Sequence, residues 1–127
     1  MPLVRIALIK GKPQSYKNAI GESIHRALTE TISVPALDRF QLFSEHDRGD
    51  LVYDPEYLGI KRGDGIVIIQ ITLNGGRTLE LKRALFTRIA ELLQQSPGIR
   101  KEDVFINLLE VAKENWSFGN GVAQYAA

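Results

Sequence analysis

The sequence contains no cysteine, which excludes a disulfide framework, a thiolate nucleophile and a cysteine-ligated metal or iron–sulfur site. It also lacks an excess of either charge, because 16 basic residues against 15 acidic residues leave a formal net charge of +1. Such a chain creates no large positive field to attract nucleic acid or anionic lipid. We therefore expect no nucleic-acid partner, and any catalysis must use groups other than thiols.

Long apolar runs are absent as well. The longest one, residues 66–73, is interrupted by Gln70 and Thr72 and is far shorter than the roughly 20 residues that a membrane-spanning helix requires. The first residues, 1–5, show neither the charged lead nor the longer apolar segment of a secretory signal. These absences predict a cytoplasmic protein with no membrane partner.

Sequence patterns for bound groups are also lacking. The chain has no G-x-x-x-x-G-K-S/T loop to hold a nucleotide phosphate, and no set of histidine, aspartate and glutamate has the spacing of metal ligands. Any reaction at this protein is therefore expected to need neither a metal nor a cofactor.

The composition that is present is typical of a small globular protein. The chain has 127 residues and a mass of 14.2 kDa, with 44% apolar and 24% charged residues. These fractions exclude a disordered or coiled-coil chain, and the length leaves no room for a second independent core. We expect a single domain over residues 1–127.

The first half of the chain reads as strand, helix, strand. Residues 3–9 are mostly aliphatic and are followed by a turn cluster at 10–13. Apolar residues then recur at spacings of three and four over 16–32, which predicts an amphipathic helix. Residues 39–44 alternate in polarity and predict the second strand.

The second half repeats this order after a long loop, residues 46–65, that has no sustained period. Residues 66–73 predict a buried strand, and Thr78 is placed to cap a helix over 79–94. A fourth strand is predicted at 104–110. The buried face of the second helix is predicted to consist of Leu85, Ile89, Leu92 and Leu93.

Two βαβ units result, at about 2–46 and 66–110, with a tail at 111–127. Right-handed crossovers place both helices on one face of a four-stranded mixed sheet, so the fold class is an α/β two-layer sandwich. The strands at 3–9 and 66–73 look apolar on both sides, as in strands buried on both faces. The second face is therefore expected to be covered by other subunits.

Pro2 is the first candidate for chemistry. If Met1 is removed, as a small second residue permits, Pro2 becomes a secondary amine at the start of a strand. A free α-amino group titrates near 8, and burial or a nearby cation lowers its pKa toward the range useful for general base work. A processed terminus without function is the alternative, and retention of Met1 would make the Pro2 nitrogen an amide.

Four segments, one of them the start of the chain at Pro2, make a resemblance specific, and together with the helix patterns they span nearly the whole chain. The sequence resembles the tautomerase superfamily, and within it most closely the malonate semialdehyde decarboxylase group. The segments that carry this similarity are Pro2-Leu3-Val4-Arg5-Ile6, Val34-Pro35-Ala36-Leu37-Asp38-Arg39-Phe40-Gln41, Gly76-Arg77-Thr78 and Asn115-Trp116-Ser117-Phe118-Gly119.

The resemblance implies an assembly and a set of site residues. Members pair βαβ units and assemble as homotrimers around an amino-terminal proline, here Pro2. Asp38 then lies in the active site, and Trp116 with Phe118 forms its aromatic wall. Arg77 begins the second helix, where backbone N–H groups and the helix dipole already favour an anion, and is expected to bind a substrate carboxylate.

One position departs from the pattern, because the decarboxylases of this type carry a second arginine where this chain has Gly75. Two reactions of a small oxo acid therefore stay open: decarboxylation of a 3-oxo acid such as malonate semialdehyde, or keto–enol tautomerisation of a 2-oxo acid such as phenylpyruvate. A ferredoxin-like binding or regulatory module is the non-enzymatic alternative.

Three other polar or aromatic residues are assigned no catalytic role. His25 lies within the first predicted helix, beside its buried stripe, and is expected to be structural. His46 ends the second predicted strand, where it could border the pocket. Tyr125, in the tail, is not placed by any pattern.

Overall fold

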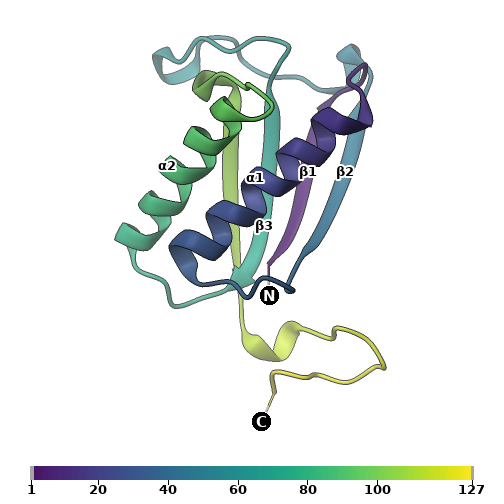
Figure 1. Ribbon diagram of the computed structural model, residues 1–127, viewed down its shortest axis with the longest axis vertical. Helices are drawn as coiled ribbons and strands as arrows, with labels where there is room; N and C mark the ends of the chain where they lie inside the picture. The colour runs from purple at the N-terminus through teal and green to yellow at the C-terminus, as the bar shows by residue number, and fades with distance from the viewer. Residues whose placement is uncertain (1, 127) are drawn as a thin grey trace.

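The computed structural model describes residues 2–126 as a two-layer α/β sandwich, with both of its α-helices on one face of a four-stranded mixed sheet (Figure 1). The strand order is β2-β1-β3-β4, in which β1/β2 and β3/β4 are parallel and β1/β3 are antiparallel. The predicted fold class is therefore confirmed. The elements are β1 (Leu3–Ile9), α1 (Gln14–Ile32), β2 (Phe40–His46), β3 (Val67–Asn74), α2 (Leu79–Gln95) and β4 (Val104–Val111).

The element bounds agree with the sequence prediction to within two residues. β2 continues to His46 because its register with β1 pairs Ile9 with His46, so hydrogen bonding extends the strand beyond the region of alternating polarity. α2 begins after Thr78, whose side-chain oxygen accepts a hydrogen bond from the backbone N–H of Leu81 at 3.2 Å. That bond satisfies one of the otherwise unpaired donors at the helix start.

The hydrophobic core lies between the sheet and the helices. The even-numbered residues of β1 and the odd-numbered residues of β3 point into it and meet the apolar stripes of α1 and α2. The predicted face of α2 is confirmed, and the core side of β4 is partly buried against the same cluster. The members with almost no exposure are Ile6, Ile20, Ile24, Ala27, Ile69, Ile71, Ile89 and Leu93.

The other face of the sheet is less apolar than the sequence suggested. Arg5 on β1 stands opposite Gln70 on β3, and Gln70 stands opposite Asn107 on β4. The Gln70 amide donates to Asn107 Oδ1 at 3.3 Å, so a polar row crosses the middle of this face. The expectation that the strands are apolar on both sides is therefore wrong at the centre. Large exposed apolar side chains flank the row: Phe40, Leu42, Phe105 and Leu109.

A buried carboxylate holds the long loop between β2 and β3. Asp103, 5% exposed just before β4, accepts hydrogen bonds from the backbone N–H of Gly63 at 2.8 Å and from Arg100 at 3.2 Å. Gly65 passes close by, since a Cβ added there would lie 3.2 Å from Asp103 Oδ2. The loop contains two short 3₁₀ turns, Arg48–Asp50 and Tyr57–Gly59.

Asp103→Ala is expected to lower the free energy of unfolding by about 2–3 kcal/mol, because it leaves the N–H of Gly63 and the guanidinium of Arg100 without their acceptor. Urea denaturation followed by circular dichroism measures this. Asp50→Ala is the control, since Asp50 is an exposed residue in the same loop. Equal stability of the two variants would show that Asp103 does not anchor the loop.

No helix in the described part of the chain combines the length and the apolar character needed to cross a membrane. His25 fits its expected structural place, because its Nε2 donates to the carbonyl oxygen of Ala36 at 2.8 Å and so ties α1 to the segment before β2.

Candidate active site

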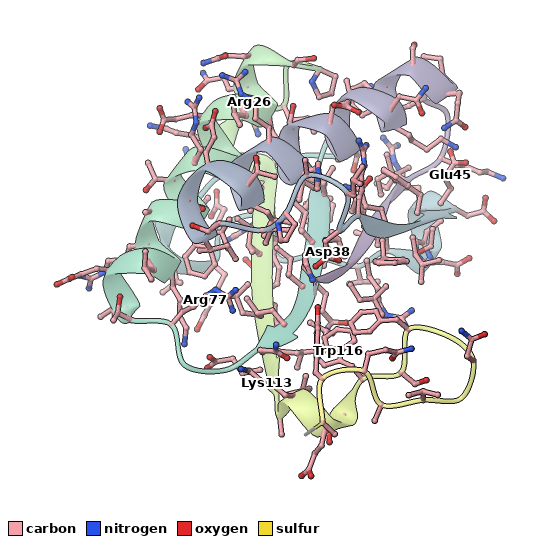
Figure 2. All side chains as sticks on the ribbon, turned by 60° about the horizontal axis from the view of Figure 1, so that its bottom comes forward. Arg26, Asp38, Glu45, Arg77, Lys113 and Trp116 are labelled. Carbon is pink, nitrogen blue, oxygen red and sulfur yellow. The ribbon has the colours of Figure 1, made fainter. Side chains whose placement is uncertain are left out.

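The topology brings four distant segments of the chain to one edge of the sheet. Because β1 and β2 are parallel, their amino ends lie together there. Because β3 is antiparallel to β1 and β4 is parallel to β3, the carboxyl ends of β3 and β4 lie at the same edge. Figure 2 shows Asp38, Arg77 and Trp116 approaching this edge from three different segments.

Pro2 lies at this edge, directly before β1, and is buried. It lines a pocket of about 240 Å³ together with Leu3, Phe40, Trp116, Ser117 and Phe118. The structure thus places three of the predicted site residues, the proline and the two aromatic residues of the tail, around one cavity.

Stacked aromatic rings form the wall of this pocket. The rings of Trp116 and Phe118 are nearly parallel, with centroids 5.3 Å apart and an interplanar angle of 7°. Phe118 also meets Phe40 at 6.1 Å and Tyr125 edge-on at 4.9 Å. Offset and edge-to-face arrangements of this kind are favourable beyond the area that they bury. The wall therefore joins the start of β2 to the tail.

The tail reaches this position by folding back on itself. Gly119 and Gly121 have φ angles of +137° and +67°, which residues other than glycine rarely adopt. The Gln124 amide holds the turn, because it accepts from the N–H of Phe118 and donates to the carbonyl oxygen of Gly119, each at 2.9 Å. This places Tyr125 against Phe118, a contact that the sequence did not predict.

Arg77 lies between the end of β3 and the start of α2, after Gly76, whose φ is +110°. Its side chain is partly buried, and its Nη1 donates to the carbonyl oxygen of Asn74 at 2.9 Å. This bond uses one of the five N–H donors of the guanidinium. The end of β3 thus holds the Arg77 side chain at this edge.

Asn74 is a candidate site residue that no sequence pattern indicated. It is the last residue of β3 and is only 6% exposed. Its Oδ1 accepts a hydrogen bond from the indole Nε1 of Trp116 at 2.7 Å. The one available signal was an amide side chain directly before the glycines and the arginine.

Glu110, which is close enough to Arg77 to feel its charge, forms an ion pair with Lys82. Glu110 Oε1 lies 2.9 Å from Lys82 Nζ. The hydrogen bond from Lys82 is the main cause that lowers the pKa of Glu110, and the backbone of Gly76 and the charge of Arg77 add to it. A Cβ at Gly75 would lie 3.5 Å from Glu110 Oε2. A larger residue at Gly75 would therefore meet a carboxylate.

Two predicted site residues do not line the cavity at Pro2. Asp38 is partly buried in the turn before β2, where its backbone N–H donates to the carbonyl oxygen of Pro35 at 3.0 Å. Neither Asp38 nor Arg77 belongs to the described residues that line this pocket, although both lie at the same edge. The structure therefore gathers the five predicted residues at one end of the sheet without joining all of them in one cavity.

The suggestion that His46 could border the pocket is wrong. His46 pairs with Ile9 at the carboxyl end of β1, whereas the pocket lies at the amino end. Figure 2 shows Glu45, the residue before it, well away from Asp38. Within residues 2–126, no group of three or more histidine, aspartate or glutamate side chains is arranged to hold a metal ion.

The fold and this edge define a class of protein, which comparison with known families identifies. Two family models, both described as tautomerase enzyme, match residues 38–119 and 2–61. The chain belongs to the tautomerase superfamily and is an enzyme. This confirms the resemblance found in the sequence and removes the binding-module alternative.

Individual relatives and solved structures show which members of the superfamily this chain is similar to. The chain is 41% identical to "Probable tautomerase YusQ" of Bacillus subtilis (strain 168), over 98% of each chain, and 32% identical to "Probable tautomerase YrdN" of the same strain, over 98% of this chain and 96% of that one. It is 40% identical to the FG41 malonate semialdehyde decarboxylase inhibited by 3-bromopropiolate, with a TM-score of 0.91 over 97% of this chain and 93% of that one. A second malonate semialdehyde decarboxylase structure is 28% identical, also with a TM-score of 0.91, over 97% and 95%.

Proposed function

We propose that the protein decarboxylates a small 3-oxo acid of the malonate semialdehyde kind. The reaction needs no cofactor, and the amine of Pro2 is the reacting group. The observation that carries the proposal is the burial of Pro2 in an aromatic-walled pocket at the edge where Arg77 lies. The similarity in sequence and structure to two malonate semialdehyde decarboxylases supports this choice of substrate.

The chemistry requires a free amine at Pro2. Met1 lies outside the described residues, and its expected removal would convert the Pro2 nitrogen from an amide into a secondary amine. The apolar surroundings of Pro2 disfavour the charged form of that amine, whereas a nearby carboxylate such as Asp38 favours it. The balance between these two influences would set the protonation state with which Pro2 meets its substrate.

In the decarboxylation, Arg77 would bind the carboxylate of the 3-oxo acid and Pro2 would act on the carbonyl group. The protonated amine either hydrogen-bonds to the carbonyl oxygen or, after losing its proton, condenses with the carbonyl carbon to an iminium and releases water. The carbon–carbon bond then breaks, CO₂ leaves, and the electron pair passes to the polarised carbonyl or iminium. Protonation at carbon and, for the iminium, hydrolysis complete the reaction.

The aromatic wall and Asp38 would assist in different ways. Trp116 and Phe118 exclude water from the carboxylate, and a less polar environment favours its conversion to neutral CO₂. Asp38 would orient Pro2 or activate a water molecule.

Tautomerisation of a 2-oxo acid such as phenylpyruvate is the second candidate. It is favoured by Gly75, which leaves Arg77 without a neighbouring arginine, and by the names of the two Bacillus subtilis relatives. Here neutral Pro2 would take the enol proton and return it to carbon, while Arg77 binds the carboxylate. Tautomerisation therefore needs neutral Pro2, whereas hydrogen bonding to the carbonyl oxygen in the decarboxylation needs protonated Pro2.

Parallel assays on the purified protein distinguish them. Release of CO₂ from malonate semialdehyde is followed with a coupled assay, and loss of the enol form of phenylpyruvate is followed by its ultraviolet absorbance. We expect kcat/KM to be higher for malonate semialdehyde. Activity on phenylpyruvate alone would assign the second function, and activity on neither would contradict the proposal.

A homotrimer is proposed as the working assembly. The superfamily resemblance implies it, and exposed apolar residues on the open face of the sheet and just before β2 need a cover: Leu37 is 96% exposed, Phe40 and Leu42 are each 49% exposed, and Leu109 is 43% exposed. At about 25 cal/mol per Å², burying several hundred Å² per subunit gives a large gross driving force before the costs of association. Multi-angle light scattering at micromolar concentration is expected to give three times the chain mass. A monomer at that concentration would contradict the proposal.

A further inference from the structure

Asn74 contacts two predicted site residues that otherwise come from separate parts of the chain. Its side-chain Oδ1 accepts from Trp116 Nε1 at 2.7 Å, and its backbone carbonyl oxygen accepts from Arg77 Nη1 at 2.9 Å. Asn74 itself is 6% exposed and sits in the last pairing position of β3, opposite Val111 on β4. A buried residue of a paired strand therefore links the aromatic wall to the guanidinium.

We propose that Asn74 is a positioning residue that fixes the indole of Trp116 relative to the guanidinium of Arg77. This inference rests on the proposed function, because it assigns the aromatic wall and the arginine to one substrate. Two hydrogen bonds to a single buried residue set the distance between the two groups, and a displacement of about 1 Å can lower the rate substantially. The acceptor also fixes one ring orientation of Trp116, since an indole donates only through Nε1.

A purely structural role for Asn74 would be to end β3 and begin the turn at Gly75. In that case its side chain would serve the local backbone, as asparagine side chains in turns commonly do. Here the Oδ1 acceptor instead reaches a residue 42 positions along the chain, in the tail. The turn at Gly75 does not require this hydrogen bond, so the Asn74 side chain has a second role in holding the tail.

Two variants remove this hydrogen bond from opposite sides. Asn74→Ala removes the acceptor and leaves the backbone carbonyl that holds Arg77, while Trp116→Phe removes the donor and keeps an aromatic ring. Each is expected to lower kcat for the better oxo-acid substrate by about tenfold and to change KM by less than about twofold. The kcat of the double variant is expected to equal about that of the less active single variant, since both changes break the same hydrogen bond.

Fluorescence gives a readout that needs no turnover, because Trp116 is the only tryptophan in the sequence. In Asn74→Ala its emission is expected to shift to longer wavelength and its anisotropy to fall, since the indole loses its buried partner. Asn18→Ala is the matched control: Asn18 is an exposed asparagine on α1 whose Oδ1 accepts from Gln14 at 3.0 Å. It should leave kcat, emission and anisotropy unchanged.

The outcomes separate this inference from the proposed function. If the parent turns over neither oxo acid, the proposed function fails, and the emission of Asn74→Ala still shows whether Asn74 holds the indole. An unchanged emission in Asn74→Ala, an unchanged kcat in an active parent background, or additive losses in the double variant would each overturn the positioning role. Loss of kcat with the emission shift and non-additivity would support it.

Discussion

Replacing Pro2 with alanine is expected to lower kcat by about 10²- to 10⁴-fold, the range that a positioned acid–base group contributes. Alanine is also small enough to permit removal of Met1, so the variant still presents a free amine at the same place. That amine is primary, however, and it lacks the ring that fixes the direction of the proline nitrogen. The core side chains of β1, at Val4, Ile6 and Leu8, are untouched, so folding should be preserved.

Pro13→Ala is the matched control for this prediction. Pro13 precedes α1, which begins beyond the carboxyl end of β1 and therefore far from the pocket, and it is exposed. Steady-state kinetics on the better oxo-acid substrate and thermal denaturation of both variants complete the comparison. A kcat equal to that of the parent in Pro2→Ala would remove Pro2 from the mechanism, whatever the cause of its burial.

The second large effect is expected at Arg77. Arg77→Ala should lower kcat/KM by an amount equivalent to about 2–5 kcal/mol, because it removes a charged contact to the substrate carboxylate. KM should rise and kcat should fall together, since this contact also orients the bond that reacts. Inhibition by a simple carboxylate that occupies the same site should weaken in parallel.

Arg83→Ala tests whether this effect belongs to the position or only to the charge. Arg83 is an exposed arginine on α2, six residues further along the chain, so its removal changes the net charge equally. If both variants lose the same activity, the loss reflects the long-range field of the protein. If Arg77→Ala behaves like the parent, the Arg77 side chain serves only its contact with Asn74, and the carboxylate site lies elsewhere.

The fold was predictable because each element carries its own periodic signal. The apolar spacing of α2 identified Leu85, Ile89, Leu92 and Leu93 as its buried face, and the structure buries these four residues. β1 has the predicted bounds because its aliphatic run ends at a turn cluster. In these elements local pattern and tertiary packing favour the same structure, so the sequence alone was sufficient.

The open face of the sheet shows where a local pattern is not enough. In the sequence, Gln70 interrupts an apolar run, and Arg5 lies within another predicted strand. Only the register of the strands shows that these residues and Asn107 form one polar row across the sheet. Register is set by pairing between distant segments, and the composition of a single strand does not contain it.

The sequence indicated which residues lie together at this edge, and it did not indicate the contacts between them. The resemblance indicated Pro2, Asp38, Arg77, Trp116 and Phe118, and the topology gathers them at one edge. The contacts between them depend on how the tail folds back, which places Tyr125 against Phe118 and the Trp116 indole on Asn74. Turns of this kind are stabilised by contacts that form only after the tail has folded, so they leave little periodic signal.

If the nitrogen of Pro2 carries the chemistry, Met1 must be removed from the active protein, and the mass of the intact purified chain shows whether it is. We expect the mass of a chain that begins at Pro2, with a free secondary amine. A fully active protein whose mass includes Met1 would exclude this role for Pro2, because the Pro2 nitrogen would then be an amide without a basic or nucleophilic lone pair.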